Sequence, residues 1–325
     1  MSIIVTGGAG FIGSCMVRTL NDCGMDDIIV VDHIGETDKW LNLRNKKYRD
    51  YVHKDLFLSQ LKEGKYNKEN CQAVIHLGAC SSTTERKFDY LYNNNFEYSK
   101  VLWDYCKEKQ ISFLYASSAA TYGGGELGFH DEMDIDKLRP LNGYGYSKQL
   151  FDLWVKKQTE FPAQYVGFKF FNVYGPNEYF KGTMASMIYH GYKQIKETGK
   201  IRLFKSCNPE YKDGEQLRDF VYVKDVCDVL MYMLKHSEIN GLYNVGTGKA
   251  QSFRELAESV FYALGKPVNI EYIEMPEHLK EKYQYYTQAD IEKLRNTGYG
   301  KEFHGLKKGA EDYVCNYLDQ EFAIY

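Results

Sequence analysis

A chain of 325 residues exceeds one average domain and has room for two. Hydrophobic residues make up 44% and charged residues 26%, proportions that are typical of a globular protein and exclude a disordered or fibrous chain. The net charge of −3 argues against a nucleic-acid-binding protein, because such proteins carry a basic surplus, and no apolar run approaches the roughly 20 residues of a membrane span.

Neither a secretory signal nor a metal site is indicated by the sequence. The apolar run at residues 3–5 stops at glycines and is too short for a signal peptide. The eight cysteines form no Cys-x-x-Cys pair, so we expect reduced thiols and a cytoplasmic protein. The eight histidines show no His-Glu-x-x-His spacing, and no metal site is predicted.

Strand and helix patterns alternate through the first half of the chain. Buried-type strands are predicted at 3–6, 27–32, 73–77, 113–116 and 165–171. Helical patterns are predicted at 12–20, 91–105 and 147–159. Because alternation of this kind builds βαβ units, we expect an α/β fold with a doubly wound parallel sheet that carries helices on both faces.

The second half of the chain is less regular. A turn at 172–176 ends the preceding strand, a helical stripe spans 226–234, and a short strand at 242–245 ends at Gly246. Ser252 and Glu255 form a capping box that opens another helix. We expect a larger domain of residues 1–171, to which 221–247 crosses back. Residues 172–220 and 248–325 are expected to form a smaller, mixed α/β domain that packs closely against it.

A glycine-rich turn lies between the first strand and the first helix. Gly7, Gly10 and Gly13 form a Gly-x-x-Gly-x-x-Gly pattern there. Glycines permit the tight turn and let the backbone approach a pyrophosphate, while the following helix N-terminus offers free N–H groups to that anion. The strand before the turn and the helix after it make the pattern specific, so it predicts a dinucleotide-binding site.

The charges near the second strand leave the choice of dinucleotide open. Asp32 ends that strand, and an acid at this place accepts hydrogen bonds from the adenosine ribose of NAD. Lys39 and Lys54 lie in neighbouring loops and are able to neutralise the 2′-phosphate of NADP. From these residues alone, NAD and NADP are equally favoured.

A tyrosine and a lysine stand four residues apart in Tyr144-Gly145-Tyr146-Ser147-Lys148, so a helix would place Tyr144 and Lys148 on one face. A nearby cation lowers the pKa of a tyrosine, and Tyr144 would then take the proton from a substrate hydroxyl as hydride leaves the same carbon. Lys148 would also hold the nicotinamide ribose. Ser118, just after the 113–116 strand, would bind the reacting oxygen. Together these residues predict a hydride-transfer site.

Motifs at 6–13, 77–85, 115–124, 144–148 and 172–176 resemble those of the extended short-chain dehydrogenases, in particular the NAD-dependent epimerase/dehydratase type. More narrowly, the string 78–85 (Gly-Ala-Cys-Ser-Ser-Thr-Thr-Glu) and the segments 181–186, 218–223 and 283–290 resemble the branch that epimerises ADP-linked heptoses for lipopolysaccharide core synthesis. The resemblance runs nearly end to end. It implies a Rossmann-type domain at 1–171, a substrate-binding domain, and a homo-oligomer, commonly a pentamer.

The resemblance also implies one tightly bound NADP per subunit, with Lys39 and Lys54 at the 2′-phosphate. Further cofactor positions correspond to Phe11, Ile12, His33, Leu77, Gly78, Ala79, Cys80, Ser81, Asn94, Val173 and Lys181. The positions for an ADP-heptose substrate correspond to Asn172, Thr183, His190, Phe204, Lys205, Ser206, Cys207, Arg218 and Tyr283. Among these, Arg218 suits a diphosphate because its guanidinium forms a planar, two-pronged donor.

Lys181 corresponds to a second catalytic position of that branch. The carbon to be inverted bears no acidic proton, so its oxidation to a planar ketone and the return of hydride to the other face explain the inversion. Tyr144 would act as the acid or base for one orientation of the ketone, and Lys181 would act as the acid or base for the other. A lysine acting as a base needs a pKa lowered by burial or by neighbouring cations.

Two features depart from the branch pattern: His33 replaces a frequent Asn, and the stretch 206–217 is several residues longer. The longer stretch affects the nucleotide contacts of residues 205–207.

A 4,6-dehydratase is disfavoured, because Ala120 and Thr121 stand where such enzymes carry Asp-Glu. A hexose 4-epimerase shares the same chemistry and stays open as an alternative. A non-catalytic dinucleotide sensor is disfavoured by the Tyr144–Lys148 pair.

Overall fold

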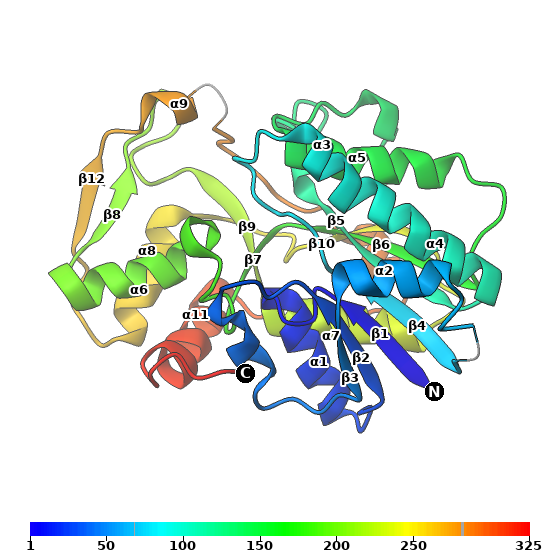
Figure 1. Ribbon diagram of the computed structural model, residues 1–325. Helices are drawn as coiled ribbons and strands as arrows, with labels where there is room; N and C mark the ends of the chain where they lie inside the picture. Colours follow the sequence, from blue (N-terminus) through cyan, green and yellow to red (C-terminus); the bar gives the residue numbers. More distant parts are fainter. Residues whose placement is uncertain (68, 281–282) are drawn as a thin grey trace.

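Seven parallel strands form the central sheet of the computed structural model, which describes residues 1–67, 69–280 and 283–325 (Figure 1). They are β1 Ser2–Thr6, β2 Ile28–Asp32, β3 Asp50–His53, β4 Cys71–His76, β5 Ser112–Ser118, β6 Gln164–Phe170 and β10 Gly241–Val245. Their spatial order is β10-β6-β5-β4-β1-β2-β3, and every neighbouring pair is parallel. The predicted doubly wound parallel sheet is therefore confirmed.

Helices cover both faces of this sheet (Figure 1). One face carries α1 Phe11–Asp22 and α7 Val223–Lys235; the other carries α2 Lys54–Lys62, α4 Tyr98–Lys109 and α5 Gly143–Lys156, with the short α3 Phe88–Leu91 beside α5. Successive side chains of a strand point to opposite faces. Accordingly, Ile3 and Val5 of β1 pack in the core that includes α1 and α7, whereas Ile4 packs in the core on the other face.

The remaining elements gather beside the central sheet (Figure 1). A three-stranded sheet has the order β11-β9-β7, and a two-stranded sheet pairs β12 with β8. The strands are β7 Asn172–Tyr174, β8 Ile201–Phe204, β9 Leu217–Tyr222, β11 Ala250–Ser252 and β12 Ile270–Ile273; the helices are α6 Met187–Thr198, α8 Phe253–Ala263, α9 Glu277–Lys280, α10 Glu292–Asn296 and α11 Leu306–Tyr313. The capping box of Ser252 and Glu255 is confirmed at the start of α8.

The strand order reverses between β1 and β4. From β1 the chain proceeds to β2 and β3 on one side, and then returns to place β4 on the other side of β1. At such a point the loops that leave the two strands diverge, which opens a crevice at the carboxyl edge of the sheet. Gly7 follows β1 and Gly78 lies close behind β4, so both line this crevice.

Two observed boundaries matter for the site. α5 begins at Gly143, four residues before the predicted helix start, and the side chain of its N-cap Asn142 accepts a hydrogen bond from the Gly145 amide at 2.8 Å. Tyr144 therefore lies in the first turn of α5. β5 runs on to Ser118, which is its last residue. Among the described residues, no helix is long and apolar enough to cross a membrane.

Candidate active site

A cleft of about 510 Å³ lies at the carboxyl edge of the central sheet. One wall consists of the glycine turn and the segments that follow β4 and β5. The opposite wall comes from the segments that follow β6 and β7, with Gln284 and Thr287. Predicted site residues that line the cleft are Gly7, Gly10, Phe11, Ile12, Gly13, Asp32, Lys39, Leu77, Gly78, Ala79, Ser81, Ser118, Tyr144, Lys148, Asn172, Val173 and Lys181.

The glycine turn brings backbone segments of β1, α1 and the loop after β4 so close together that no side chain fits between them. Gly7 has φ +68°, and a Cβ there would lie 2.6 Å from the Gly78 amide nitrogen. A Cβ on Gly13 would lie 2.0 Å from the Gly7 carbonyl oxygen. Gly10 caps α1 without a side chain, and the first turn of α1 holds no acid. The free amides of this helix N-terminus fit the pyrophosphate of a dinucleotide.

A side pocket of about 150 Å³ adjoins the glycine turn and is lined by Asp32, His33, Lys39, Lys54 and Asn94, among others. The carboxylate of Asp32 accepts hydrogen bonds from the Ala9 amide at 2.8 Å and from Lys39 Nζ at 2.7 Å. Lys54 Nζ donates to Asn94 Oδ1 at 2.6 Å. Because Lys39 neutralises Asp32, the pocket tolerates a ligand anion, and Lys54 adds a second positive charge.

Tyr144, Lys148 and Ser118 meet in the cleft. Burial raises the pKa of Tyr144, an effect that its contact with the Ser118 side chain opposes. The lowered pKa expected for Tyr144 from the sequence is therefore wrong for this arrangement, because burial outweighs the other influences. Lys148 Nζ donates to the Ala116 carbonyl at 2.9 Å, and burial lowers the pKa of Lys148 to about 8.

Lys181 enters the same cleft from the opposite wall. Its Nζ lies 5.0 Å from the centre of the Phe11 ring. Burial lowers the pKa of Lys181, and the buried Glu178 partly counteracts this. A lysine whose pKa is lowered by burial is suited to exchange protons at neutral pH. The structure thus brings Lys181 to the same cleft as Tyr144.

The predicted substrate contacts lie farther out. The Arg218 guanidinium carbon lies 5.3 Å from the centre of the Tyr283 ring, and Arg218 donates to the backbone of Gln284, whose side chain reaches the cleft. The Cys207 amide donates to the hydroxyl of Tyr285 at 3.2 Å, in the same region. Residues that were predicted for the site but line neither the cleft nor its side pocket are Cys80, Thr183, His190, Phe204, Lys205, Ser206, Cys207, Arg218 and Tyr283.

Two of these residues have other partners in the structure. Lys205 forms an ion pair of 2.6 Å with Glu274. Cys80 exchanges backbone hydrogen bonds with the side chain of Asn95, at 2.8 and 3.0 Å. These contacts hold Lys205 away from the cleft and fix the loop that follows β4.

Asn95 and Asn177 contribute to the site but were missed in the sequence. Asn95 is fully buried in a π-helical segment and also donates to Ser147 Oγ of α5 at 3.0 Å. Asn177 lines the cleft with φ 74° and donates to Ser14 Oγ of α1 at 2.9 Å. The Gly-Pro-Asn sequence at 175–177 is a signal for this turn, since Asn tolerates left-handed backbone.

Comparison with known proteins places these features in a family. The model of the NAD dependent epimerase/dehydratase family matches residues 3–246. A protein of Fusobacterium nucleatum named ADP-L-glycero-D-manno-heptose-6-epimerase is 54% identical over 98% of both chains, and one of that name from Nitratidesulfovibrio vulgaris is 50% identical over 97% of both. The crystal structure of the Helicobacter pylori ADP-L-glycero-D-manno-heptose-6-epimerase is similar, with TM-score 0.82, 27% identity and coverage of 97% of this chain and 95% of that one.

Proposed function

The chain belongs to the NAD dependent epimerase/dehydratase family, and from this membership and the cleft we propose that it is an ADP-L-glycero-D-manno-heptose 6-epimerase. The enzyme interconverts ADP-D-glycero- and ADP-L-glycero-β-D-manno-heptose by inverting C6. The observation that carries this proposal is the meeting of the glycine turn, Tyr144 and Lys181 in one cleft. Near full-length identity to relatives named for this activity supports the choice of substrate.

We propose that NADP, when bound, would supply the redox chemistry as the acceptor and donor of the C6 hydride. Gly7, Gly10 and the start of α1 hold its pyrophosphate. Lys148 holds the nicotinamide ribose, and Ser118 donates a hydrogen bond to the reacting oxygen on C6. Tyr144 takes the proton from the C6 hydroxyl during oxidation or gives one to the ketone oxygen during reduction.

Inversion requires that hydride return to the face opposite the one it left, so the ketone turns within the cleft between the two transfers. The reacting oxygen then moves away from one proton-transfer group and toward another. Tyr144 on α5 and Lys181 on the opposite wall are the two groups that we assign to the two orientations. The burial that lowers the pKa of Lys181 supports this second role.

NADP is proposed over NAD on the charges of the side pocket. Lys39 neutralises Asp32, so this acid does not repel a 2′-phosphate, and Lys54 lies in the same pocket. His33 and Asn94 complete the pocket wall. The remaining cofactor contacts are assigned to Phe11, Ile12, Leu77, Gly78, Ala79, Cys80, Ser81, Val173 and Lys181.

The ADP-heptose is proposed to extend from Tyr144 toward Arg218 and Tyr283, with the Arg218 guanidinium on the diphosphate. Asn172, Thr183, His190 and residues 204–207 complete this substrate surface. In this arrangement residues 1–171, joined by 221–247, form the NADP-binding domain, and residues 172–220 and 248–325 form the substrate-binding domain. Because β10 pairs with β6, the returning segment is part of the central sheet.

The direct test is to incubate the purified protein with ADP-D-glycero-D-manno-heptose, without added coenzyme, and to follow the configuration at C6 by NMR. Inversion without build-up of reduced coenzyme is expected. Unchanged heptose together with conversion of a UDP-hexose at C4 would contradict the proposed substrate.

The family resemblance also supports a cellular setting. We propose a cytoplasmic homo-oligomer, a ring of five chains, whose product is used in lipopolysaccharide core synthesis. Sedimentation equilibrium of the purified protein should give the mass of five chains, and a monomer mass would contradict the ring.

A further inference from the structure

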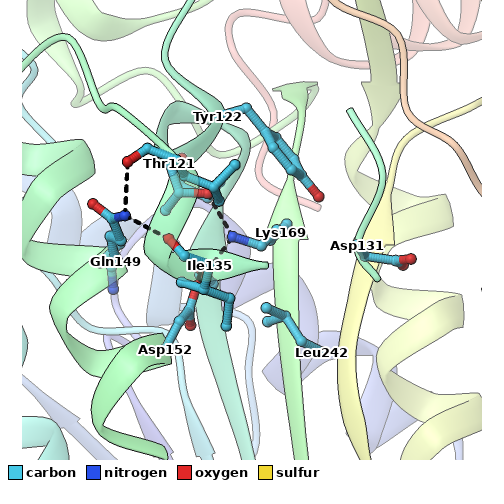
Figure 2. Close-up of polar contacts among 12 residues, drawn as sticks. Thr121, Tyr122, Asp131, Ile135, Gln149, Asp152, Lys169 and Leu242 are labelled. Atoms are coloured by element: carbon cyan, nitrogen blue, oxygen red, sulfur yellow. Dashed lines mark hydrogen bonds and ion pairs between the residues drawn. The ribbon is translucent and has the colours of Figure 1, made fainter. Parts of the chain in front are cut away.

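A buried ion pair joins α5 and β6 next to the cleft. Lys169 Nζ lies 3.1 Å from Asp152 Oδ2, and the two side chains are only 1% and 0% exposed. The same Nζ lies 4.9 Å from the centre of the Tyr122 ring. A fully buried ion pair is expensive to desolvate and is weak evidence for a purely stabilising role. Its neighbours, shown in Figure 2, indicate what it does.

Asp152 fastens α5 to β5. Its carboxylate accepts hydrogen bonds from Ser117 Oγ at 2.7 Å and from the Tyr115 hydroxyl at 3.3 Å, both on β5. Asp152 follows Lys148 by one helical turn on α5, and Lys148 itself donates to Ala116 of the same strand. Asp152 therefore fixes the distance between β5 and the part of α5 that carries Lys148.

Lys169 is linked by hydrogen bonds to the turn that follows β5 and begins at Ser118. Its Nζ donates to Thr121 Oγ1 at 2.5 Å (Figure 2). Thr121 Oγ1 in turn donates to the Ser118 carbonyl at 2.8 Å. The Ser118 hydroxyl accepts a hydrogen bond from the Ala120 amide at 3.1 Å. These bonds hold the 3₁₀ turn Ala119–Tyr122, which begins at Ser118. Thr121 thus points into this buried cluster.

We propose that Asp152, Lys169 and Thr121 are positioning residues that hold Ser118 at a fixed place relative to Tyr144 and Lys148. None of the three lines the cleft, so each acts through a residue that does. The ion pair joins the two parts: Asp152 holds the helix with the acid–base groups, and Lys169 holds the turn with the hydroxyl. This inference rests on the proposed epimerase function and deepens it.

Asp152 has a second, electrostatic effect. Of the groups that face Lys148, Asp152 on α5 is the strongest influence that raises its pKa, ahead of Cys80 from the loop after β4. Burial lowers the pKa of His76 on β4, and the charge of Lys148 adds to this effect. Burial lowers the pKa of Lys169 on β6, an effect that Asp152 and, from a further segment, Asp131 oppose. The carboxylate of Asp152 therefore helps Lys148 to keep its proton.

The electrostatic effect is tested with the double variant Asp152→Asn/Lys169→Met, which removes both buried charges and leaves neither unpaired. Loss of the carboxylate should move the alkaline limb of the kcat–pH profile for C6 epimerisation down by about one pH unit. The matched control is Lys156→Met, because Lys156 lies on the same helix but pairs with exposed Asp134 and Asp136. An alkaline limb at its wild-type position, in a folded double variant, would contradict this effect.

The positioning effect is tested with Thr121→Val, which breaks the link from Lys169 to Ser118 without removing a charge. We expect kcat to fall by about tenfold with KM and the alkaline limb unchanged, and Thr121→Ser to restore kcat. A kcat equal to that of wild type in Thr121→Val would contradict the proposal. If the double variant does not fold, the result for Thr121→Val alone decides whether the positioning proposal holds. Each kcat and KM of a variant is compared with that of the wild-type enzyme. If the wild-type enzyme itself does not epimerise the heptose, the proposed function is refuted and not the positioning role.

Discussion

Tyr144 and Tyr146 lie two residues apart on α5 and face different surroundings. Tyr144 lines the cleft, whereas Tyr146 is 45% exposed and stacks on Phe88. We expect Tyr144→Phe to lower kcat by about 10²–10⁴-fold, because it removes the group that moves the proton. Cofactor binding should persist, since the ring stays. Steady-state kinetics, with Tyr146→Phe as the control, measure this.

Equal activity in Tyr144→Phe and Tyr146→Phe would contradict the role of Tyr144. The same two variants distinguish an enzyme from a non-catalytic dinucleotide sensor. A sensor would keep its response to the cofactor in both variants.

The buried Lys148 sets a limit at alkaline pH. Its pKa is lowered to about 8, so the side chain is a cation below that pH and neutral above it. A neutral Lys148 would donate weaker hydrogen bonds to the nicotinamide ribose that we assign to it, because charge-assisted hydrogen bonds are the stronger ones. We therefore expect kcat to fall as pH rises through about 8, measured between pH 6 and 10 on folded enzyme. A profile that stays flat to pH 10 would show that the protonation of Lys148 is irrelevant.

Lys54 is assigned to the 2′-phosphate. Replacing it in Lys54→Met removes a charge-assisted hydrogen bond, so the Kd for NADPH should rise by about 10–100-fold while that for NADH changes little. Titration by nicotinamide fluorescence measures both constants. Lys62→Met is the control, because Lys62 is exposed at the far end of the same helix. Equal effects on NADPH and NADH would argue against this assignment.

The unit of β1, the glycine turn and α1 depends on the close approach of backbone atoms. In Gly13→Ala the new methyl group would meet the Gly7 carbonyl oxygen at 2.0 Å, so α1 has to shift away from the turn. Overpacking of this kind costs about 1–3 kcal/mol, and we expect coenzyme binding to weaken by about tenfold or more. Equilibrium titration with NADPH measures this.

Gly305→Ala is the matched control for Gly13→Ala. Gly305 is the N-cap of α11 and so also lies near the start of a helix, but a Cβ there has nothing within 4 Å. Unchanged coenzyme affinity in both variants would show that the turn does not contact the dinucleotide.

Six of the seven strands of the central sheet were predictable because their signals are local, whereas the short edge strand β3 was not predicted. Runs such as Ile28–Asp32 and Gly241–Val245 are short, apolar and ended by polar or glycine residues, as buried parallel strands are. The start of α5 was missed because its first turn, Gly143-Tyr144-Gly145, contains weak helix formers. The strands β8 and β12 form a separate two-stranded sheet and are only partly buried. Their sequences therefore lack the continuous apolar run that marks a buried central strand.

The candidate site was predictable where one short motif carries the chemistry. The glycine turn and the Tyr144–Lys148 pair are of this kind. Lys181, by contrast, came from family resemblance, because a lone lysine in a loop has no spacing that reveals its burial. Asp152 and Lys169 were missed because 17 positions separate them, and only the packing of α5 on β6 brings them together.

At the scale of the whole molecule, both walls of the cleft rest on one continuous core. Buried side chains of β1 and α1 pack in the same cluster as those of α6 and α8, which lie beside the central sheet. The elements that carry the glycine turn are therefore packed against the elements beside the central sheet through one shared core.

The account depends on one hydride that leaves C6 and returns to it within the cleft. The most direct test uses substrate that carries deuterium at C6, in ordinary water, with NMR and mass spectrometry of the epimerised product. We predict that the product keeps its deuterium at C6. Replacement of that deuterium by solvent hydrogen at the rate of inversion would contradict hydride return and would require a different mechanism.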